Sequence, residues 1–115
     1  MKKYIAKLVF NIQVKDGVNQ SQFDEQLRLI EATTSADAFL KARMLGEKEQ
    51  TIFKNATGEN VNWKFIDVSD IQLLNSLNDG TEIYSFTREE EDSKDYINFI
   101  RRKAQVLQIR EMAFA

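Results

Sequence analysis

The sequence predicts an α+β fold: a mostly antiparallel sheet of about five strands, one helix after the second strand, and a long C-terminal helix. Three observations predict it. Apolar side chains alternate with a period of two over residues 4–14. Turn residues at 55–60 and 78–80 separate runs rich in β-branched and aromatic residues. Residues 93–112 carry apolar side chains at helical spacing. The 115 residues fit a single domain.

The first two strands are expected to form a hairpin. Residues 16–22 form a short polar loop, and residues 23–32 form the second strand, so the two strands pair antiparallel. In the second strand, Phe23, Leu27 and Leu29 share a face. The first strand places on one face Tyr4, Ala6, Leu8, Phe10, Ile12 and Val14.

A helix follows the second strand. Residues 33–35 supply N-cap side chains, and Asp37 suits the positive end of the helix dipole. Gly46 is a candidate stop signal, although the charged run 47–49 is compatible with a longer helix. The apolar face consists of Ala38, Ala42 and Leu45.

Three further strands are expected, at residues 51–53, 61–68 and 81–87. Between the last two, Ser69 and Asp70 are suited to cap a short helical turn that ends at Leu74 or Leu77. Within the strand at 61–68 the side chains that face together are Val61, Trp63 and Phe65.

The C-terminal helix is acidic at its start, over residues 89–92, and basic later, an order that matches the helix dipole. Two readings of its apolar residues stay open: one wide stripe buried on its own sheet, or one stripe on the sheet and a second against a partner. The second reading predicts a homo-oligomer. The first stripe is Ile97, Ile100, Ala104 and Leu107, and the predicted interface stripe is Phe99, Val106 and Ile109.

The composition excludes several kinds of chemistry. The chain has no His, Cys or Pro, so imidazole and thiolate ligands, cysteine nucleophiles and disulfides are absent. We therefore expect no catalytic residues, no metal and no cofactor. The net charge of -2 gives no electrostatic drive toward nucleic acid. No stretch reaches the ~18 apolar residues of a membrane span, and a cytoplasmic protein is expected.

Candidate ligand-binding residues lie on the predicted strands. A cleft against the sheet would be lined by Arg28, Trp63 and Lys64. Trp63 shares its face with apolar neighbours, which favours a core position over ligand stacking. The polar residues Arg28, Glu31, Lys64, Glu82 and Tyr84 are compatible either with an anion or small-ligand site or with cross-strand ion pairs.

Four segments stand in a suggestive order: EQLRLIEA at 25–32, the helix that contains Ala38, Ala42 and Gly46, VNWKF at 61–65, and DGTEIYS at 79–85. In this combination the chain resembles a family of small bacterial proteins known as domain of unknown function 4288. The resemblance covers residues 1–88, which form a family-like core of the single domain 1–115, and 89–115 form a helical extension. It implies an α+β fold and no particular activity.

The function predicted from these features is a non-enzymatic protein-interaction or oligomeric module. One form of it is an immunity or antitoxin-like protein that neutralises a partner. The alternatives are a small-ligand-binding domain and, less favoured, an enzyme that uses carboxylates or an oxygen-ligated metal.

Overall fold

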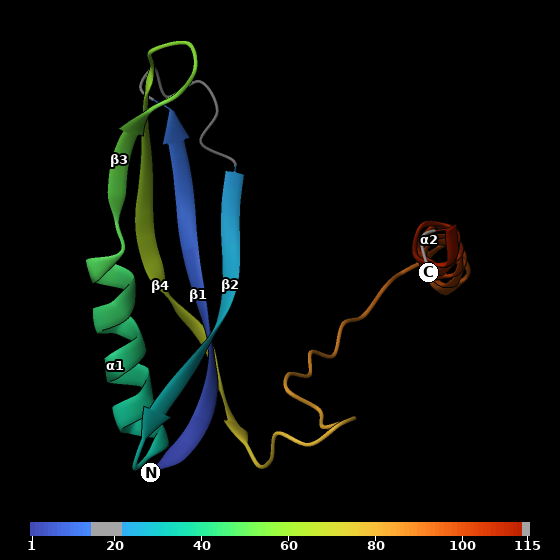
Figure 1. The fold of residues 1–115 in the computed structure, drawn as a ribbon, viewed down its shortest axis with the longest axis horizontal. Coiled ribbons are helices and arrows are strands. Elements are labelled where there is room, and N and C mark those ends of the chain that lie inside the picture. The colour runs from blue at the N-terminus through green and yellow to red at the C-terminus, as the bar shows by residue number, and fades with distance from the viewer. Residues whose placement is uncertain (15–21, 114–115) are drawn as a thin grey trace. The chain divides into compact units, whose positions relative to one another are not determined.

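The computed structural model describes residues 1–14 and 22–113, and the chain divides into two compact units, Met1–Ser85 and a second unit from Phe86 onward. The first unit is an α+β fold, as predicted (Figure 1). Its strands are β1 (Lys2–Val14), β2 (Gln22–Ala32), β3 (Thr51–Lys54) and β4 (Asn60–Leu74), and its helix is α1 (Ser35–Lys48). The strands form one antiparallel sheet in the order β2-β1-β4-β3.

The hairpin of β1 and β2 follows the predicted alternation. Tyr4, Ala6, Leu8 and Phe10 are all buried, and they face α1. Cross-strand partners share a face, so Tyr4 opposite Ile30 and Lys2 opposite Ala32 bring the buried residues of β2 into the same core. Most of the predicted loop at 16–22 lies outside the described residues, and Gln22 already belongs to β2.

The side chains of Phe23, Leu27 and Leu29 share a face, as predicted, but it is the outer face of the sheet, away from α1. Their strand partners are Asn11, Lys7 and Ile5, which alternate with the core residues of β1. Each of the three is exposed by about half, at 58%, 51% and 52% respectively. The core-facing side chains of β2 therefore belong to the residues that alternate with these three, such as Ile30 and Ala32.

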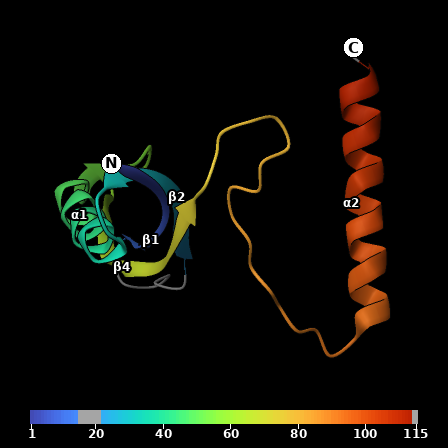
Figure 2. The same cartoon turned by 90° about the horizontal axis from the view of Figure 1, so that it is seen from below.

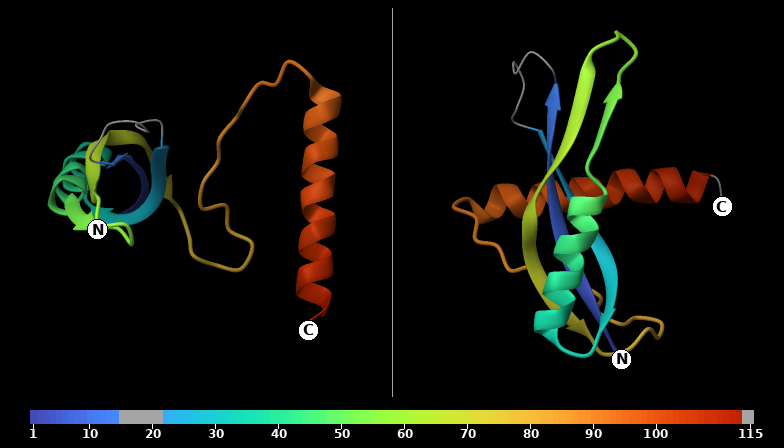
Figure 3. Two further views of the ribbon diagram at one scale, coloured as in Figure 1. Left: turned by 90° about the horizontal axis from the view of Figure 1, so that it is seen from above. Right: turned by 90° about the vertical axis from the view of Figure 1, so that its left-hand side faces the viewer.

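The helix α1 covers part of the concave side of the curled sheet (Figures 2 and 3). Thr34 is the N-cap, because its hydroxyl oxygen accepts a hydrogen bond from the backbone N–H of Asp37 at 3.1 Å. The buried positions Ala38 and Ala42 carry only a methyl group, which lets the helix axis approach the sheet closely.

Gly46 does not end α1, contrary to its reading as a stop signal. The helix continues through Lys48, with Glu49 at the C-cap, and Gly46 is buried within it. A Cβ atom at this position would collide with the ring of Phe65 on β4. Gly46 is therefore a packing residue, and its position in the sequence near the end of the helix reflects where the phenyl ring lies.

Two predictions for the region after Val68 are wrong. The helical turn expected from Ser69 is not formed, because β4 continues as far as Leu74 and pairs with β1 past two register shifts. The strand expected at 81–87 is not formed either, and the sheet that the described residues form has four strands instead of about five. The N–H of Ser85 donates to the side-chain oxygen of Gln72 at 3.3 Å, and the C=O of Ser85 accepts from the side-chain nitrogen of Gln72 at 2.7 Å. In a strand, the backbone of a neighbouring strand would make these hydrogen bonds.

The remaining elements form where the sequence predicted them. β3 pairs with β4, and the turn between them is closed by a hydrogen bond from the backbone N–H of Asn55 to the C=O of Glu59 at 2.9 Å. Gly58 has a φ of +83°, in the left-handed region that favours glycine. In the second unit, α2 (Ser93–Ala113) forms where a long helix was predicted. Neither helix of the described chain has the length and apolar character needed to cross a membrane.

Candidate functional site

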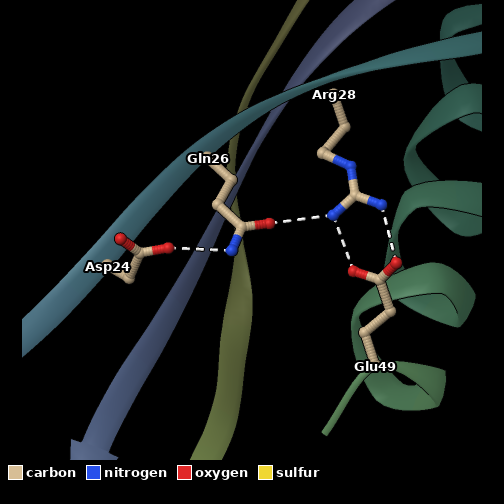
Figure 4. Close-up of polar contacts among 4 residues, drawn as sticks. All are labelled: Asp24, Gln26, Arg28 and Glu49. Atoms are coloured by element: carbon tan, nitrogen blue, oxygen red, sulfur yellow. Dashed lines mark hydrogen bonds and ion pairs between the residues drawn. The ribbon is translucent and has the colours of Figure 1, made fainter.

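Arg28 of β2 lies at the centre of a group of polar side chains on the helix-facing side of the sheet. Its guanidinium binds the carboxylate of Glu49 through two hydrogen bonds, Nη1 to Oε2 at 2.6 Å and Nη2 to Oε1 at 2.7 Å (Figure 4). Arg28 is the strand partner of Ala6 and so lies on the core side of the sheet. Glu49 is placed by the C-terminus of α1. The pair therefore joins the edge strand to the end of the helix.

A row of polar residues continues from Arg28 along β2 (Figure 4). Nη1 of Arg28 also donates to Oε1 of Gln26 at 2.8 Å, and Nε2 of Gln26 donates to Oδ2 of Asp24 at 2.8 Å. The three residues are two apart in sequence, so the strand places them on one face. Gln26 bridges a cation and an anion, since its amide offers one acceptor to Arg28 and one donor to Asp24.

The electrostatics of the pair keep both groups charged. Hydrogen bonding to Glu49 raises the pKa of Arg28, and partial burial opposes that effect. The same contact lowers the pKa of the Glu49 carboxyl; partial burial opposes this effect, and the charges of Arg28 and Lys48 lower the pKa further. An incoming anion would compete with the Glu49 carboxylate for the charge of the guanidinium. The arrangement is suited to holding α1 against β2.

A second bidentate pair holds the other side of α1. Arg43 donates to both carboxylate oxygens of Asp67 on β4, with Nε to Oδ1 and Nη2 to Oδ2 each at 2.9 Å. The guanidinium of Arg43 also lies 4.4 Å from the centroid of the Phe39 ring. The hydrogen bonds from Arg43 lower the pKa of Asp67. α1 is thus anchored by ion pairs to strands on both sides of β1.

A separate polar cluster lies on the outer face, around Lys7 of β1. Its Nζ is 3.1 Å from Oε1 of Glu25 and 5.4 Å from the centroid of the Tyr84 ring. The Tyr84 hydroxyl donates to Oδ2 of Asp70 at 3.1 Å. A hydrogen bond from Gln72 is the main cause of the lowered pKa of Asp70. These contacts hold the segment before Ser85 against β4 and β1.

The residues proposed from sequence for a ligand cleft do not share one face. Trp63 is half-buried on the helix-facing side, with its ring centroid 6.3 Å from that of Phe10. Lys64 is exposed on the outer side, where its strand partner is Asn11. Arg28 lies on the side of Trp63 and is bonded to Glu49. Of the other polar candidates, Glu31 is exposed opposite Lys3.

Sequence reasoning missed the partners in these contacts, namely Glu49 for Arg28, Asp67 for Arg43, and Lys7, Asp70 and Gln72 around Tyr84. The β1 alternation already placed Lys7 opposite to the core residues. Nothing local indicated Asp67 or Asp70, because the register between β1 and β4 shifts twice between Lys7 and Phe10.

Within the second unit, none of the 21 residues of the helix α2 is buried. The stripe predicted to be an interface is the more exposed of the two: Phe99, Val106 and Ile109 are 51%, 60% and 71% exposed. The first stripe is somewhat less exposed, with Ile97, Ile100 and Leu107 at 46%, 43% and 48%. A shallow hollow on the surface of α2 is lined by Phe99, Arg102, Lys103, Val106 and Leu107.

The comparisons with known proteins identify the family and nothing more specific. The model of the family described as a domain of unknown function (DUF4288) matches residues 3–85, and the chain belongs to this family. No curated protein and no solved structure matches it. The resemblance drawn from the sequence is thereby confirmed. The match covers the α+β unit and stops short of α2.

Proposed function

We propose that this member of the family is a non-enzymatic interaction module that associates with a second copy of itself through α2. The observation that carries the proposal is a helix of 21 residues with two apolar stripes and no side chain buried within its own unit. In water, isolated helices gain little stability from their own hydrogen bonds, and most helical stability in proteins comes from packing of an apolar face. A partner surface supplies that packing.

The predicted interface is the stripe of Phe99, Val106 and Ile109. Exposed apolar patches of this kind are uncommon on soluble monomers. Full burial of each side chain is worth about 1.5–3 kcal/mol. Two copies contribute six such groups that are now between half and three-quarters exposed, so their burial contributes about 5–11 kcal/mol. Association costs about 4–15 kcal/mol in lost freedom. The two ranges overlap, so these six groups support a dimer only together with further contacts from flanking residues, and the affinity is moderate and depends on protein concentration.

The ligand-binding alternative receives less support. The guanidinium of Arg28 donates to Glu49 and Gln26, and the other two cleft residues lie on opposite faces of β4. An anion at this position would therefore compete with the Glu49 carboxylate, and only Trp63 of the other two cleft residues lies on the same side of the sheet.

The test compares the intact chain with Phe99→Asp by light scattering over a range of protein concentrations. The two Phe99 side chains, each 51% exposed in the single chain, contribute about 1.5–3 kcal/mol on the same scale, so their loss raises the dissociation constant about 10- to 150-fold. The unpaired carboxylates of the aspartates add to this loss. We expect a dimer for the intact chain at high micromolar concentration and a monomer for Phe99→Asp.

Gln108→Asp is the matched control. It introduces the same residue into the same helix nine positions later, two and a half turns away and therefore on the opposite side. This variant should remain dimeric. A monomeric intact chain, or a Phe99→Asp variant that dimerises like the intact chain, contradicts the proposal. Thermal unfolding monitored by circular dichroism distinguishes loss of association from loss of the fold. If Phe99→Asp is unfolded while Gln108→Asp is folded, Phe99 belongs to a core.

A further inference from the structure

We infer that two copies of α2 pair in antiparallel orientation, with Phe99 of one copy against Ile109 of the other. This inference rests on the proposed self-association and adds the orientation of the partner. Its starting point is the full row of residues along the interface side of the helix. At alternating spacings of four and three, the pattern of a helix-pairing seam, this row, here called the seam, reads Asp95, Phe99, Arg102, Val106, Ile109 and Ala113.

The two charged residues of the seam discriminate between the orientations. In a parallel pair in register, Asp95 faces Asp95 of the second copy and Arg102 faces Arg102. Like charges that face each other where water is partly excluded are destabilising. In the antiparallel pair, Asp95 faces Ala113 of the second copy and Arg102 faces Val106. Each charge then has an apolar neighbour. The long side chain of Arg102 can lie over Val106 of the second copy while its guanidinium reaches water.

The residues beside the seam agree with the antiparallel arrangement. One flank consists of Tyr96, Lys103 and Arg110. Antiparallel pairing brings Tyr96 beside Arg110 of the second copy, where a cation can lie over the aromatic ring. The two Lys103 side chains approach each other, but on an exposed flank where salt screens their repulsion. The other flank is uncharged and consists of Asn98, Gln105 and Met112.

The overall charge of the segment has the same polarity. Residues 88–95 carry two basic and five acidic side chains, a net charge of -3, and residues 96–113 carry four basic and one acidic side chain, a net charge of +3. Parallel helices would align ends of equal sign. Antiparallel helices bring the acidic end of each copy toward the basic part of the other. Their helix dipoles then point in opposite directions, so the positive end of one lies beside the negative end of the other.

Disulfide cross-linking tests the orientation, and the chain has no native cysteine to interfere. Asp95→Cys and Ala113→Cys change the two ends of the seam, both exposed, and leave Phe99, Val106 and Ile109 intact. The two positions are 18 residues apart, about 27 Å along a helix, whereas a disulfide requires Cα atoms within about 7 Å. The two variants are mixed under reducing conditions and oxidised, and the products are identified by mass.

The expected product is the mixed dimer of Asp95→Cys with Ala113→Cys, in excess over either self-linked dimer. Gln108→Cys, on the opposite side of the helix, should link to neither. Self-linking of Asp95→Cys in preference to the mixed product shows parallel helices and overturns the inference. A dimer by light scattering that forms neither link places the interface elsewhere and also overturns it, while self-association itself stands. A monomer at all concentrations overturns the proposed function and this inference together.

Discussion

Replacement of Gly46 by alanine tests how closely α1 lies against the sheet. Gly46 is buried in α1, and a Cβ atom built on it would overlap three carbons of the Phe65 ring, Cδ1, Cε1 and Cζ. Phe65 has little room to move. It is 6% exposed, and its ring centroid is 5.5 Å from that of Phe10, which is itself 2% exposed.

Two effects of opposite sign determine the outcome. Alanine in place of glycine favours a helix by about 1 kcal/mol. Insertion of a methyl group into a filled core typically costs about 1–3 kcal/mol, because side chains must leave their rotamers or the backbone must shift. The overlap involves most of one edge of the ring, so the steric cost should exceed the gain. We expect Gly46→Ala to lose about 1 kcal/mol of unfolding free energy.

Urea denaturation of the intact chain and the variant measures this difference through the midpoint at constant slope. The double variant Gly46→Ala with Phe65→Leu is the informative control, because a smaller side chain at 65 makes room for the methyl group. The cost of Gly46→Ala should shrink or change sign in the Phe65→Leu background. A Gly46→Ala variant more stable than the intact chain by about 1 kcal/mol would refute the reasoning, since helix propensity would then act unopposed.

Two further predictions concern the ends of α1. Thr34→Ala should cost about 1 kcal/mol of unfolding free energy, because it removes the hydroxyl acceptor for the N–H of Asp37; urea denaturation measures the loss, and equal loss in the neighbouring Ser35→Ala would contradict it. The Arg28–Glu49 pair should stabilise the fold in a pH-dependent way. The pKa of Glu49 is lower in the folded chain than its ordinary value, so its contribution is complete above the ordinary glutamate pKa and is lost as the pH falls through the lowered one. Urea denaturation of the intact chain and Glu49→Gln at pH 7 should give unfolding free energies that differ by no more than about 1 kcal/mol, because the pair is so exposed. This difference should disappear in acid; a difference that is unchanged by acid would refute the prediction.

The sequence predicted the elements that local patterns specify. The alternation in β1 identified its core face, because a strand turns successive side chains to opposite sides. Thr34 and Asp37 marked the start of α1, since capping involves residues within one turn. Family membership was also readable from segments that lie in order along the chain, and the α2 boundaries followed from helical spacing and charge order.

The errors occurred where local and tertiary preferences compete. Ser69 and Asp70 have the chemistry of a helix start, but at this point the chain pairs with β1, whose residues are more than 60 positions away in sequence. Residues 81–87 have strand propensity, but the side chain of Gln72 occupies the backbone groups of Ser85. Propensity is a weak preference that such contacts override.

For the candidate site, the sequence singled out Arg28 but not its partner. The two bonds to Glu49 exist only because α1 docks with its C-terminus beside β2, and no pattern of spacing reports that distance. Trp63 and Lys64 illustrate the same division: their neighbouring positions placed them on opposite faces of a strand, which follows from sequence alone. Only the fold showed that Trp63 lies on the side of Arg28.

By itself, the sequence determined the types of most elements, the core face of β1 and the two stripes of α2, because periodicity and capping act over a few residues. The tertiary structure alone decided that β4 extends to Leu74, that Gly46 is a contact point for Phe65, and that Arg28 and Arg43 hold α1 on both sides of β1. Each of these depends on the distance between segments far apart in the chain. That distance is set by the packing of the whole core, to which every strand and α1 contribute at once.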